Sequence, residues 1–341
     1  MTSISEELED ASETLRAIAE ATSRTIDGAY PTHTPPDLVE AESATGALRR
    51  LGLLGVGVPE ALGGSGGTIR HAGVVAEIAG AKLHAGPVLH AQVAALALAG
   101  SAPGAVVQQV MDTDAPVNVC FVSRTDEWWS VGVRVAFGAL GAKLLLIGPD
   151  GVGRLFAARD LRPVEDDVWR SPDGSDALIA LAPTWTTLAV SDRSQAIANG
   201  LAAMSIIGGV SALLSSTVSY VSVRRQFGVP IGSFQATKHS LARVYIECHH
   251  ARALAVGALD ALSVNDPGAA RLALISKIAA DGLVNGASRC LQAHGGIGYT
   301  WESRVHRYLK QALRLRQWPA SHEALRASAR KMVIGALRTS T

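Results

Sequence analysis

The sequence predicts a mainly helical α+β protein, in which a small antiparallel β domain lies between two helical domains. Apolar residues recur at the helical period near both ends of the chain, whereas the middle contains short apolar runs separated by turn residues. Aromatic residues make up only 5%, so the apolar residues are mostly Ala, Val and Leu, which suit packed helices. We therefore expect an N-terminal helical domain at 1–116, a β domain at 117–191 and a helical bundle at 192–341.

The N-terminal domain is expected to consist of helices separated by a glycine-rich turn. Apolar spacing predicts helices within 3–54 and 71–100, with a break at Gly86-Pro87. Between them, the segment 58–67 contains a proline and four glycines, which cannot continue a helix.

The two remaining domains are distinguished by the length of their apolar segments. Short runs rich in β-branched and apolar residues predict strands at 117–121, 131–137, 143–147, 154–157 and 177–182. Longer periodic segments predict helices at 192–225, 235–263, 268–293, 303–317 and 321–337. Short loops between long helices imply antiparallel neighbours, hence a four-helix bundle with one extra helix.

The charges exclude several classes of protein. Lys+Arg is 31 and Asp+Glu is 30, so no overall field favours nucleic acid or an anionic membrane. Residues 1–50 nevertheless carry a net charge of −6 (ten acids, four arginines) and residues 301–341 one of +7 (nine bases, two acids). These segments are either two solvated faces or, alternatively, a basic end that meets an anionic ligand or an acidic neighbouring subunit.

The sequence shows no metal-binding, targeting or membrane-spanning pattern, which restricts the expected location and chemistry of the protein. The three cysteines are far apart and form no metal-binding pair, and the histidines show no metal-ligand spacing. The acidic N-terminus is unlike a targeting peptide, and the apolar segment 196–214 is interpreted as a buried helix. We expect a cytoplasmic protein with no metal, no nucleic-acid partner and no membrane span.

Two segments carry specific motifs. Residues 224–235 read RRQFGVPIGSFQ and residues 292–300 read QAHGGIGYT. With LGLLGVGVPEALGG at 51–64 and a basic helix over 302–316, they resemble the acyl-CoA dehydrogenase family across almost the whole chain. Taken alone, each motif has a plain alternative, since Gly-Gly-x-Gly is usually a helix stop and Arg-Arg-x-Phe-Gly a capped turn.

The resemblance implies an FAD-binding role for these motifs. A pyrophosphate needs cations and backbone N–H groups with little steric bulk nearby, which an arginine and glycines supply. In the family these segments reach across a subunit interface to the FAD of a neighbour. The cofactor-binding candidates are Arg224, Gln226, Phe227, Gln235, Gln292, His294, Gly295 and Gly296.

The catalytic base of the family has no counterpart in this sequence. Dehydrogenation of an acyl-CoA needs a carboxylate base, which the family places at one of two positions. Counting from the motifs, these positions hold Pro319 and Ala198, and neither can accept a proton. Glu323 lies one helical turn beyond the first position and is a weak candidate for a replacement base. Alternatively, it is a residue near the start of the last helix, where a carboxylate is favourable with the helix dipole.

The other acids and the middle domain offer little more. Asp260 and Asp281 are expected on solvent-exposed helix faces, and Glu247 and Glu302 at packing or helix-start positions. The family's flavin-ring segment on a β-strand is represented only weakly here, with Ser123 and Thr125 as candidate hydroxyls.

The resemblance is strongest to the shortened, base-lacking subunit of actinobacterial heterotetrameric steroid side-chain acyl-CoA dehydrogenases. It implies a flavoprotein complex, α2β2, in which a homologous catalytic subunit supplies the base and the isolated chain is inactive. The substrate would be a bulky acyl-CoA, with electron-transfer flavoprotein as a further partner. The alternatives are a homo-oligomeric dehydrogenase that uses Glu323 and a catalytically dead scaffold of the same fold.

Overall fold

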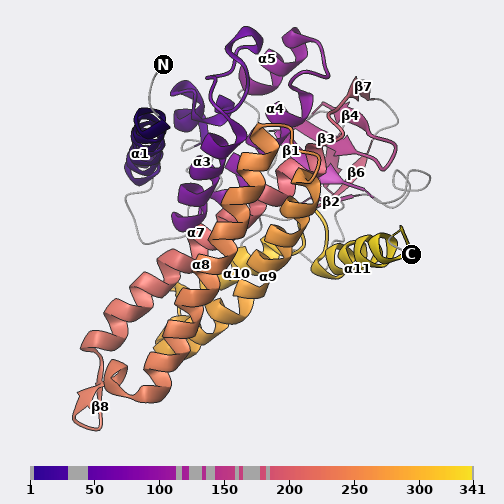
Figure 1. Ribbon diagram of the computed structural model, residues 1–341. Coiled ribbons are helices and arrows are strands. Elements are labelled where there is room, and N and C mark those ends of the chain that lie inside the picture. The colour runs from indigo at the N-terminus through magenta and orange to yellow at the C-terminus, as the bar shows by residue number, and fades with distance from the viewer. Residues whose placement is uncertain are drawn as a thin grey trace. The chain divides into compact units, whose positions relative to one another are not determined.

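Long helices, two small sheets and a two-stranded hairpin make up the part of the chain that the structure, a computed structural model, describes (Figure 1). It describes residues 4–29, 45–112, 117–122, 133–135, 143–157, 161–163, 177–181 and 185–339. The chain divides into two compact units. The first comprises Met1–Tyr30, Pro36–Val75 and Gly86–Ala198, and the second comprises Pro31–Pro35, Ala76–Ala85 and Asn199–Thr341. The three domain boundaries expected from the sequence remain a prediction.

The N-terminal helices follow the expected pattern with one shift. They are α1 (Ile4–Ala29), η1 (Leu53–Gly55), η2 (Glu60–Leu62), α3 (Ile69–Ala81), α4 (Ala85–Leu98) and α5 (Gly104–Asp112). The break expected at Gly86-Pro87 lies slightly earlier, where Leu83 has a φ of 62° and α4 begins at Ala85. Pro87 therefore lies in the first turn of α4, where a missing N–H costs nothing. The short helix α5 was not expected from the sequence.

The strands of the middle segment form two sheets, where the sequence predicted a small antiparallel β domain. They are β1 (Val117–Phe121), β2 (Val133–Val135), β3 (Lys143–Ile147), β4 (Val152–Phe156), β5 (Leu161–Pro163), β6 (Ala177–Leu181) and β7 (Thr186–Ala189). One sheet has the order β1-β3-β4-β7 and the other β2-β6-β5. The expectation of purely antiparallel pairing was wrong for β1 and β3, which pair in parallel with Val117 opposite Lys143. The 21 residues between these strands are long enough for the crossover that parallel pairing needs.

A small apolar cluster holds the larger sheet together. Leu144, Leu146 and Phe156 are buried at its centre, and Cys120, Val122 and Leu161 pack against them. Because β3 is buried along most of its length, it reads as a continuous apolar run and not as an alternating one.

The second unit is dominated by a helical bundle, as the sequence predicted. Its helices are α7 (Ser194–Val223), α8 (Gln235–Ser263), α9 (Ala269–His294), α10 (Val305–Leu315) and α11 (His322–Thr339), with α7 beginning in the first unit. Figure 1 shows α7, α8 and α9 side by side, with the short hairpin β8 (Arg225–Gln226) and β9 (Val229–Pro230) at one end. The predicted fold class, mainly helical with a small β domain, is confirmed.

The helix α7 is apolar and long enough to span a membrane by length and composition, and 89% of its most apolar window is buried inside the protein. Burial of this kind is what a core helix of a bundle shows. The apolarity of this part of α7 is therefore explained by packing within the fold.

Two glycines let α7 approach α3 closely. A Cβ atom at Gly208 would lie 2.0 Å from the carbonyl oxygen of Glu77, and one at Gly80 would lie 2.1 Å from that of Ser205. The hydroxyl of Ser205 donates a hydrogen bond of 2.7 Å to the carbonyl oxygen of Ala76. Backbone contact at this distance leaves no room for a side chain at either glycine.

Replacing Gly208 by alanine is expected to lower the free energy of unfolding by about 1–3 kcal/mol, because the methyl group overpacks a rigid backbone contact. The matched control is Gly257→Ala on α8, where an added Cβ meets nothing within 4 Å. That change should raise the free energy of unfolding by roughly 0.5–1 kcal/mol, since alanine favours the helix. Urea unfolding curves of both variants measure the difference, and equal midpoints would contradict the close approach.

A buried histidine joins α4 to β1 in the first unit. The backbone N–H of Val119 donates a 2.7 Å hydrogen bond to Nδ1 of His90, whose side chain is 1% exposed. Burial lowers the pKa of His90 to about 3, and that of His84 to about 4. Both imidazoles are thus neutral in the folded protein, and Nδ1 of His90 can act as an acceptor.

Acid is expected to destabilise the protein through these two histidines. Each has a folded pKa below its unfolded value of about 6.5, so its stabilising contribution is present above pH 6.5 and is lost as the pH falls towards the folded value. His90→Leu should flatten the fall in the free energy of unfolding between pH 7 and pH 5 by up to about 1.4 kcal/mol per pH unit. Urea unfolding curves at each pH measure this slope. An unchanged slope in His90→Leu would contradict a role of this histidine in the acid sensitivity.

Candidate cofactor site

A tight hairpin presents the first motif at the end of the bundle. Arg225 pairs with Pro230 and Gln226 with Val229, which leaves Phe227 and Gly228 as the two turn residues. Their φ angles are 53° and 81°, as a two-residue hairpin turn requires. The guanidinium of Arg225 donates to the carbonyl oxygen of Gly228 at 3.0 Å and closes the turn. The Arg225 side chain therefore makes its hydrogen bond within the hairpin.

Phe227 is strained and exposed at the same time. Its left-handed backbone costs about 1–2 kcal/mol for a residue other than glycine. Its side chain is 92% exposed. Among the residues that the structure describes, its ring has one aromatic contact, an edge contact with Phe234 at a centroid distance of 6.3 Å. A strained backbone that holds an aromatic ring out into solvent indicates that the ring meets something outside this chain.

The polar candidates of this motif are also exposed. Arg224 follows the end of α7, and Gln235 is the first residue of α8. Within the part of the chain that the structure describes, the side chains of Arg224, Gln226 and Gln235 make no hydrogen bond or ion pair. They are therefore available to a ligand or a neighbouring subunit.

The second motif forms the end of α9. Gly295 has a φ of 64° and a ψ of −149°, and its N–H donates to the carbonyl oxygen of Gln292 to end the helix. A Cβ at Gly295 or Gly296 would meet nothing within 4 Å. The positive φ of Gly295 explains why a glycine occupies this position. Nothing among the described residues requires a glycine at position 296. The open space there suits the close approach of a ligand from outside the chain.

His294 connects the two motifs. Its Nε2 lies 3.1 Å from the hydroxyl oxygen of Thr217, and its ring stacks on Tyr220 with centroids 4.4 Å apart. Thr217 donates its own proton to the carbonyl oxygen of Leu213, so it accepts the hydrogen bond from Nε2–H of His294. Burial lowers the pKa of His294, which agrees with a neutral ring.

The structure thus brings both motifs to one end of the bundle. Tyr220 lies one turn before Arg224, and His294 directly precedes Gly295. The imidazole of His294 points into the bundle, at 8% exposure, so its contact with a flavin or a phosphate stays a prediction. Thr217, Tyr220 and Phe234 were not predicted as site residues from the sequence, although the helical spacing from Arg224 would have indicated Tyr220.

The described residues fit a flavin dinucleotide at this end of the bundle. An arginine without a partner among them, three exposed glutamines, a solvent-facing aromatic ring and an open glycine turn are the groups that a pyrophosphate and an adenine need. The charge is also favourable, because the sequence carries no carboxylate between Asp192 and Glu247.

The two positions expected to carry the catalytic base are both occupied by residues without a titratable group. Ala198 lies in the second turn of α7 with an exposed fraction of 0%, and Pro319 lies in the segment between α10 and α11. Glu323 is exposed in the first turn of α11, where a carboxylate is favourable with the helix dipole.

Asp281 lies elsewhere than expected. The sequence placed it on a solvent-exposed face, and this was wrong, because Asp281 is buried in an ion pair with Lys277 at 2.5 Å and accepts a 3.1 Å hydrogen bond from His322. Burial raises the pKa of Asp281 and lowers that of Lys277, and their contact offsets part of both shifts. The Asp281 carboxylate therefore joins α9 to α11.

Glu247 and Asp260 lie where the sequence predicted. Glu247 on α8 forms an ion pair with Arg289 on α9 at 3.0 Å, a packing role, and Asp260 is exposed. Ser123 and Thr125, the candidate flavin-ring hydroxyls, lie outside the described residues. Over the ranges that are described, no group of three or more metal-ligating side chains is found.

Comparison with known proteins assigns the family. The Acyl-CoA dehydrogenase, N-terminal domain matches residues 5–103, and the Acyl-CoA dehydrogenase, C-terminal domain matches residues 197–333. This chain belongs to the acyl-CoA dehydrogenase family, and the resemblance inferred from its motifs is confirmed. Members of the family bind FAD, which agrees with the cofactor predicted from the sequence.

Two similar proteins come from Mycobacterium tuberculosis. Acyl-CoA dehydrogenase IpdE2 is 31% identical over 280 residues, which cover 77% of each chain. Acyl-CoA dehydrogenase FadE34 is 34% identical over 279 residues, 78% of this chain but only 38% of FadE34. Among solved structures, the Tcur3481–Tcur3483 steroid ACAD G363A variant has a TM-score of 0.79 at 24% identity and covers 96% of this chain and 99% of its own.

Phe227→Asn is expected to raise the free energy of unfolding by about 1 kcal/mol, since asparagine tolerates the left-handed backbone, while it weakens flavin binding. The matched control is Phe234→Asn, whose backbone has a φ of −70° and holds no such strain, so it should bring no gain. Thermal unfolding of both variants measures the difference. A loss of stability in Phe227→Asn would show that the ring is held by packing within this chain.

Proposed function

We propose that this chain is the non-catalytic subunit of a heteromeric, FAD-dependent acyl-CoA dehydrogenase, in which a homologous partner subunit supplies the base. The observation that carries this proposal is the place of the cofactor motifs. Ala198 and Arg224 are 26 positions apart, which is about 39 Å along a helix with a rise of 1.5 Å per residue. A single cofactor does not extend over that length, so the exposed motifs are positioned to serve a site on another subunit.

The chemistry supports an assignment of cofactor binding to this chain and of proton removal to its partner. The reaction removes a proton from the carbon next to the thioester and a hydride from the following carbon. FAD held by the residues named above would supply the hydride acceptor. A base for the proton must be a titratable side chain within hydrogen-bond reach. Ala198 and Pro319 have no such group, so in this proposal the proton is taken by the glutamate of the partner.

The residues of this chain then act as holders of the cofactor. Arg224 supplies a forked cation for the pyrophosphate, and the turn at Gly295 and Gly296 supplies backbone N–H groups. Phe227 offers a ring face for stacking, and Gln292 an amide at the end of α9. None of these residues needs to change protonation state.

Three further elements of the proposal rest on relatives. A solved structure of the same fold is described as a steroid ACAD and carries the names of two chains. By analogy, we propose a bulky, steroid-derived acyl-CoA as substrate, an α2β2 complex and electron-transfer flavoprotein as electron acceptor.

Purification of the chain alone and together with a longer homologue that carries the glutamate tests the proposal. We expect the lone chain to retain little flavin and to show no acyl-CoA oxidation, and the co-purified complex to show both a flavin spectrum and activity. A lone chain with a full complement of FAD that oxidises an acyl-CoA would overturn the proposal. A stable complex without flavin would favour the scaffold alternative.

Within the complex, Arg224→Gln should weaken FAD binding by about 10- to 100-fold, because a hydrogen bond to a charged group contributes roughly 1.5–3 kcal/mol. Arg271→Gln, an equally exposed arginine at the start of α9, is the control and should bind FAD as wild type does. Fluorescence titration of the apoprotein complex with FAD measures both.

A further inference from the structure

Helix α9 buries two charged side chains at a distance from the cofactor motifs. Lys277 and Asp281 are both 0% exposed and form an ion pair at 2.5 Å, one helical turn apart. Asp281 precedes His294 by 13 positions, which is about 20 Å along a helix with a rise of 1.5 Å per residue. A buried ion pair adds little net stability by itself, so the reason for this pair lies in what else it contacts.

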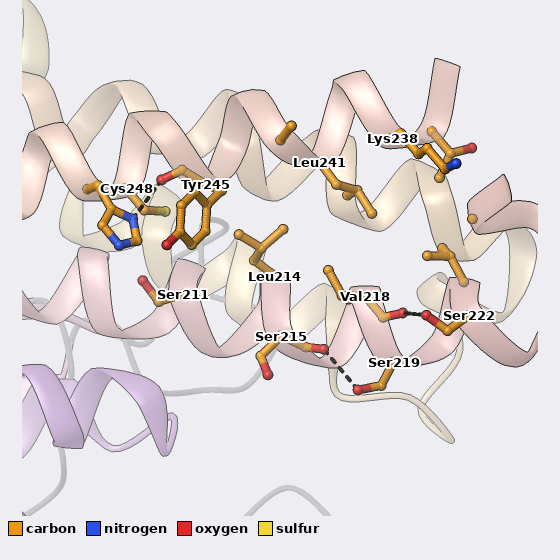
Figure 2. A pocket seen from close by; sticks show the side chains of 15 residues that line it. Ser211, Leu214, Ser215, Val218, Ser219, Ser222, Lys238, Leu241, Tyr245 and Cys248 are labelled. Carbon is orange, nitrogen blue, oxygen red and sulfur yellow. Dashed lines mark hydrogen bonds between the residues drawn. The ribbon is translucent and has the colours of Figure 1, made fainter. Parts of the chain in front are cut away.

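The pair is also separate from the cleft of the bundle. Figure 2 shows this cleft, with a volume of about 870 Å3, between α7 and α8 beside the hairpin, and Leu214, Val218 and Leu241 are directed into it. Neither Lys277 nor Asp281 is among the residues that line it. The two charges therefore serve no ligand in this cleft.

The carboxylate of Asp281 uses both of its oxygens. Oδ1 accepts a hydrogen bond from Nζ of Lys277, and Oδ2 lies 3.1 Å from Nδ1 of His322, the first residue of α11. Because an ionised carboxylate can only accept, Nδ1 of His322 carries the proton. Burial lowers the pKa of Lys277, and the nearby charge of Arg316 lowers it further. In this group of four side chains, a single acid thus offsets three basic groups.

The two helices that meet at Asp281 are held very differently by the rest of the protein. Buried residues occur along the whole of α9, from Ala269 to His294. In α11, Leu325 is the one buried side chain among residues 322–335, and every residue from 330 to 335 is exposed. The position of α11 therefore depends strongly on the contact between His322 and Asp281.

Without the charge of Asp281, Lys277 would be a buried cation without a counter-charge, next to Arg316. Burial of an unpaired charge is costly, and the cost falls when water reaches the charge. The helix α9 cannot move to admit water, because it is buried along its length, whereas α11 has one apolar anchor. The response of lowest cost is that α11 leaves α9.

We propose that Asp281 fastens α11 to α9, and that α11 is a strap that detaches as a unit while α7 and α8 stay folded. Asp281 is in this sense a positioning residue, which fixes the start of α11 three residues after Pro319. The inference does not rest on the proposed function, because the contact needs neither the cofactor nor a partner subunit.

Asp281→Asn tests the attachment, because asparagine keeps the shape of the side chain and removes its charge. We expect hydrogen exchange of the backbone amides of α11 to become about 100-fold faster in the full chain, with exchange in α7 and α8 unchanged. The matched control is Glu247→Gln, which breaks the partly exposed pair with Arg289 and should leave exchange in α11 as in wild type. Mass spectrometry of peptides from the exchanged protein measures each helix separately.

A second variant removes the other side of the contact and covers an Asp281→Asn protein that does not fold. His322→Ala removes the donor on α11 but keeps the ion pair of Asp281 with Lys277, and exchange in α11 should become about 10-fold faster. His322→Asn, whose amide can donate from near the place of Nδ1, should restore most of the protection.

Two results would overturn the inference. One is exchange in α11 that is as slow in both Asp281→Asn and His322→Ala as in wild type. The other is exchange that becomes faster in α7, α8 and α11 alike, because the four side chains would then hold the whole bundle together. Neither result bears on the proposed function, since the measurement involves no flavin and no partner.

Discussion

The contact of His294 with α7 is the interaction on which the surface proposed to hold the cofactor depends. Its neutral ring donates to Thr217 and stacks on Tyr220, so that the end of α9 is fixed beside the end of α7. The glycine turn follows His294 at once, and Arg224 follows Tyr220 by one helical turn. Two motifs that are separated in the sequence by most of α8 and α9 therefore present their polar groups at one end of the bundle.

The helix α7 imposes the second constraint. Its first part is enclosed by the protein's own packing, where Gly208 allows backbone contact with α3. Its last part leaves the enclosed region and leads into the motif that begins at Arg224, still without any charged residue of its own. A helix of this composition must be covered along its whole length, and this chain covers only part of it. The proposed partner would thus cover the same element that leads to the proposed site.

Much of the fold could be predicted because long helices show strong periodicity. The bounds of α8 and of the strands β1 and β3 agree with the prediction to the residue. The short elements α5, β5 and β7 were missed, since segments of this length show too little pattern to be recognised. The pairing of β1 with β3 was wrong in direction, because strand order depends on the path of the connection and not on the residues within the strands.

The sequence by itself determined the family, the helical bundle, and the identity of the exposed motif residues, because each follows from local periodicity or from residues adjacent in the chain. It also determined that Ala198 and Pro319 offer no base. Only the tertiary structure decided that His294 turns inward, that Asp281 is buried between Lys277 and His322, and that a cleft lies beside the hairpin. These features arise from contacts between helices, which depend on how the helices face one another and leave no periodic signal in the sequence.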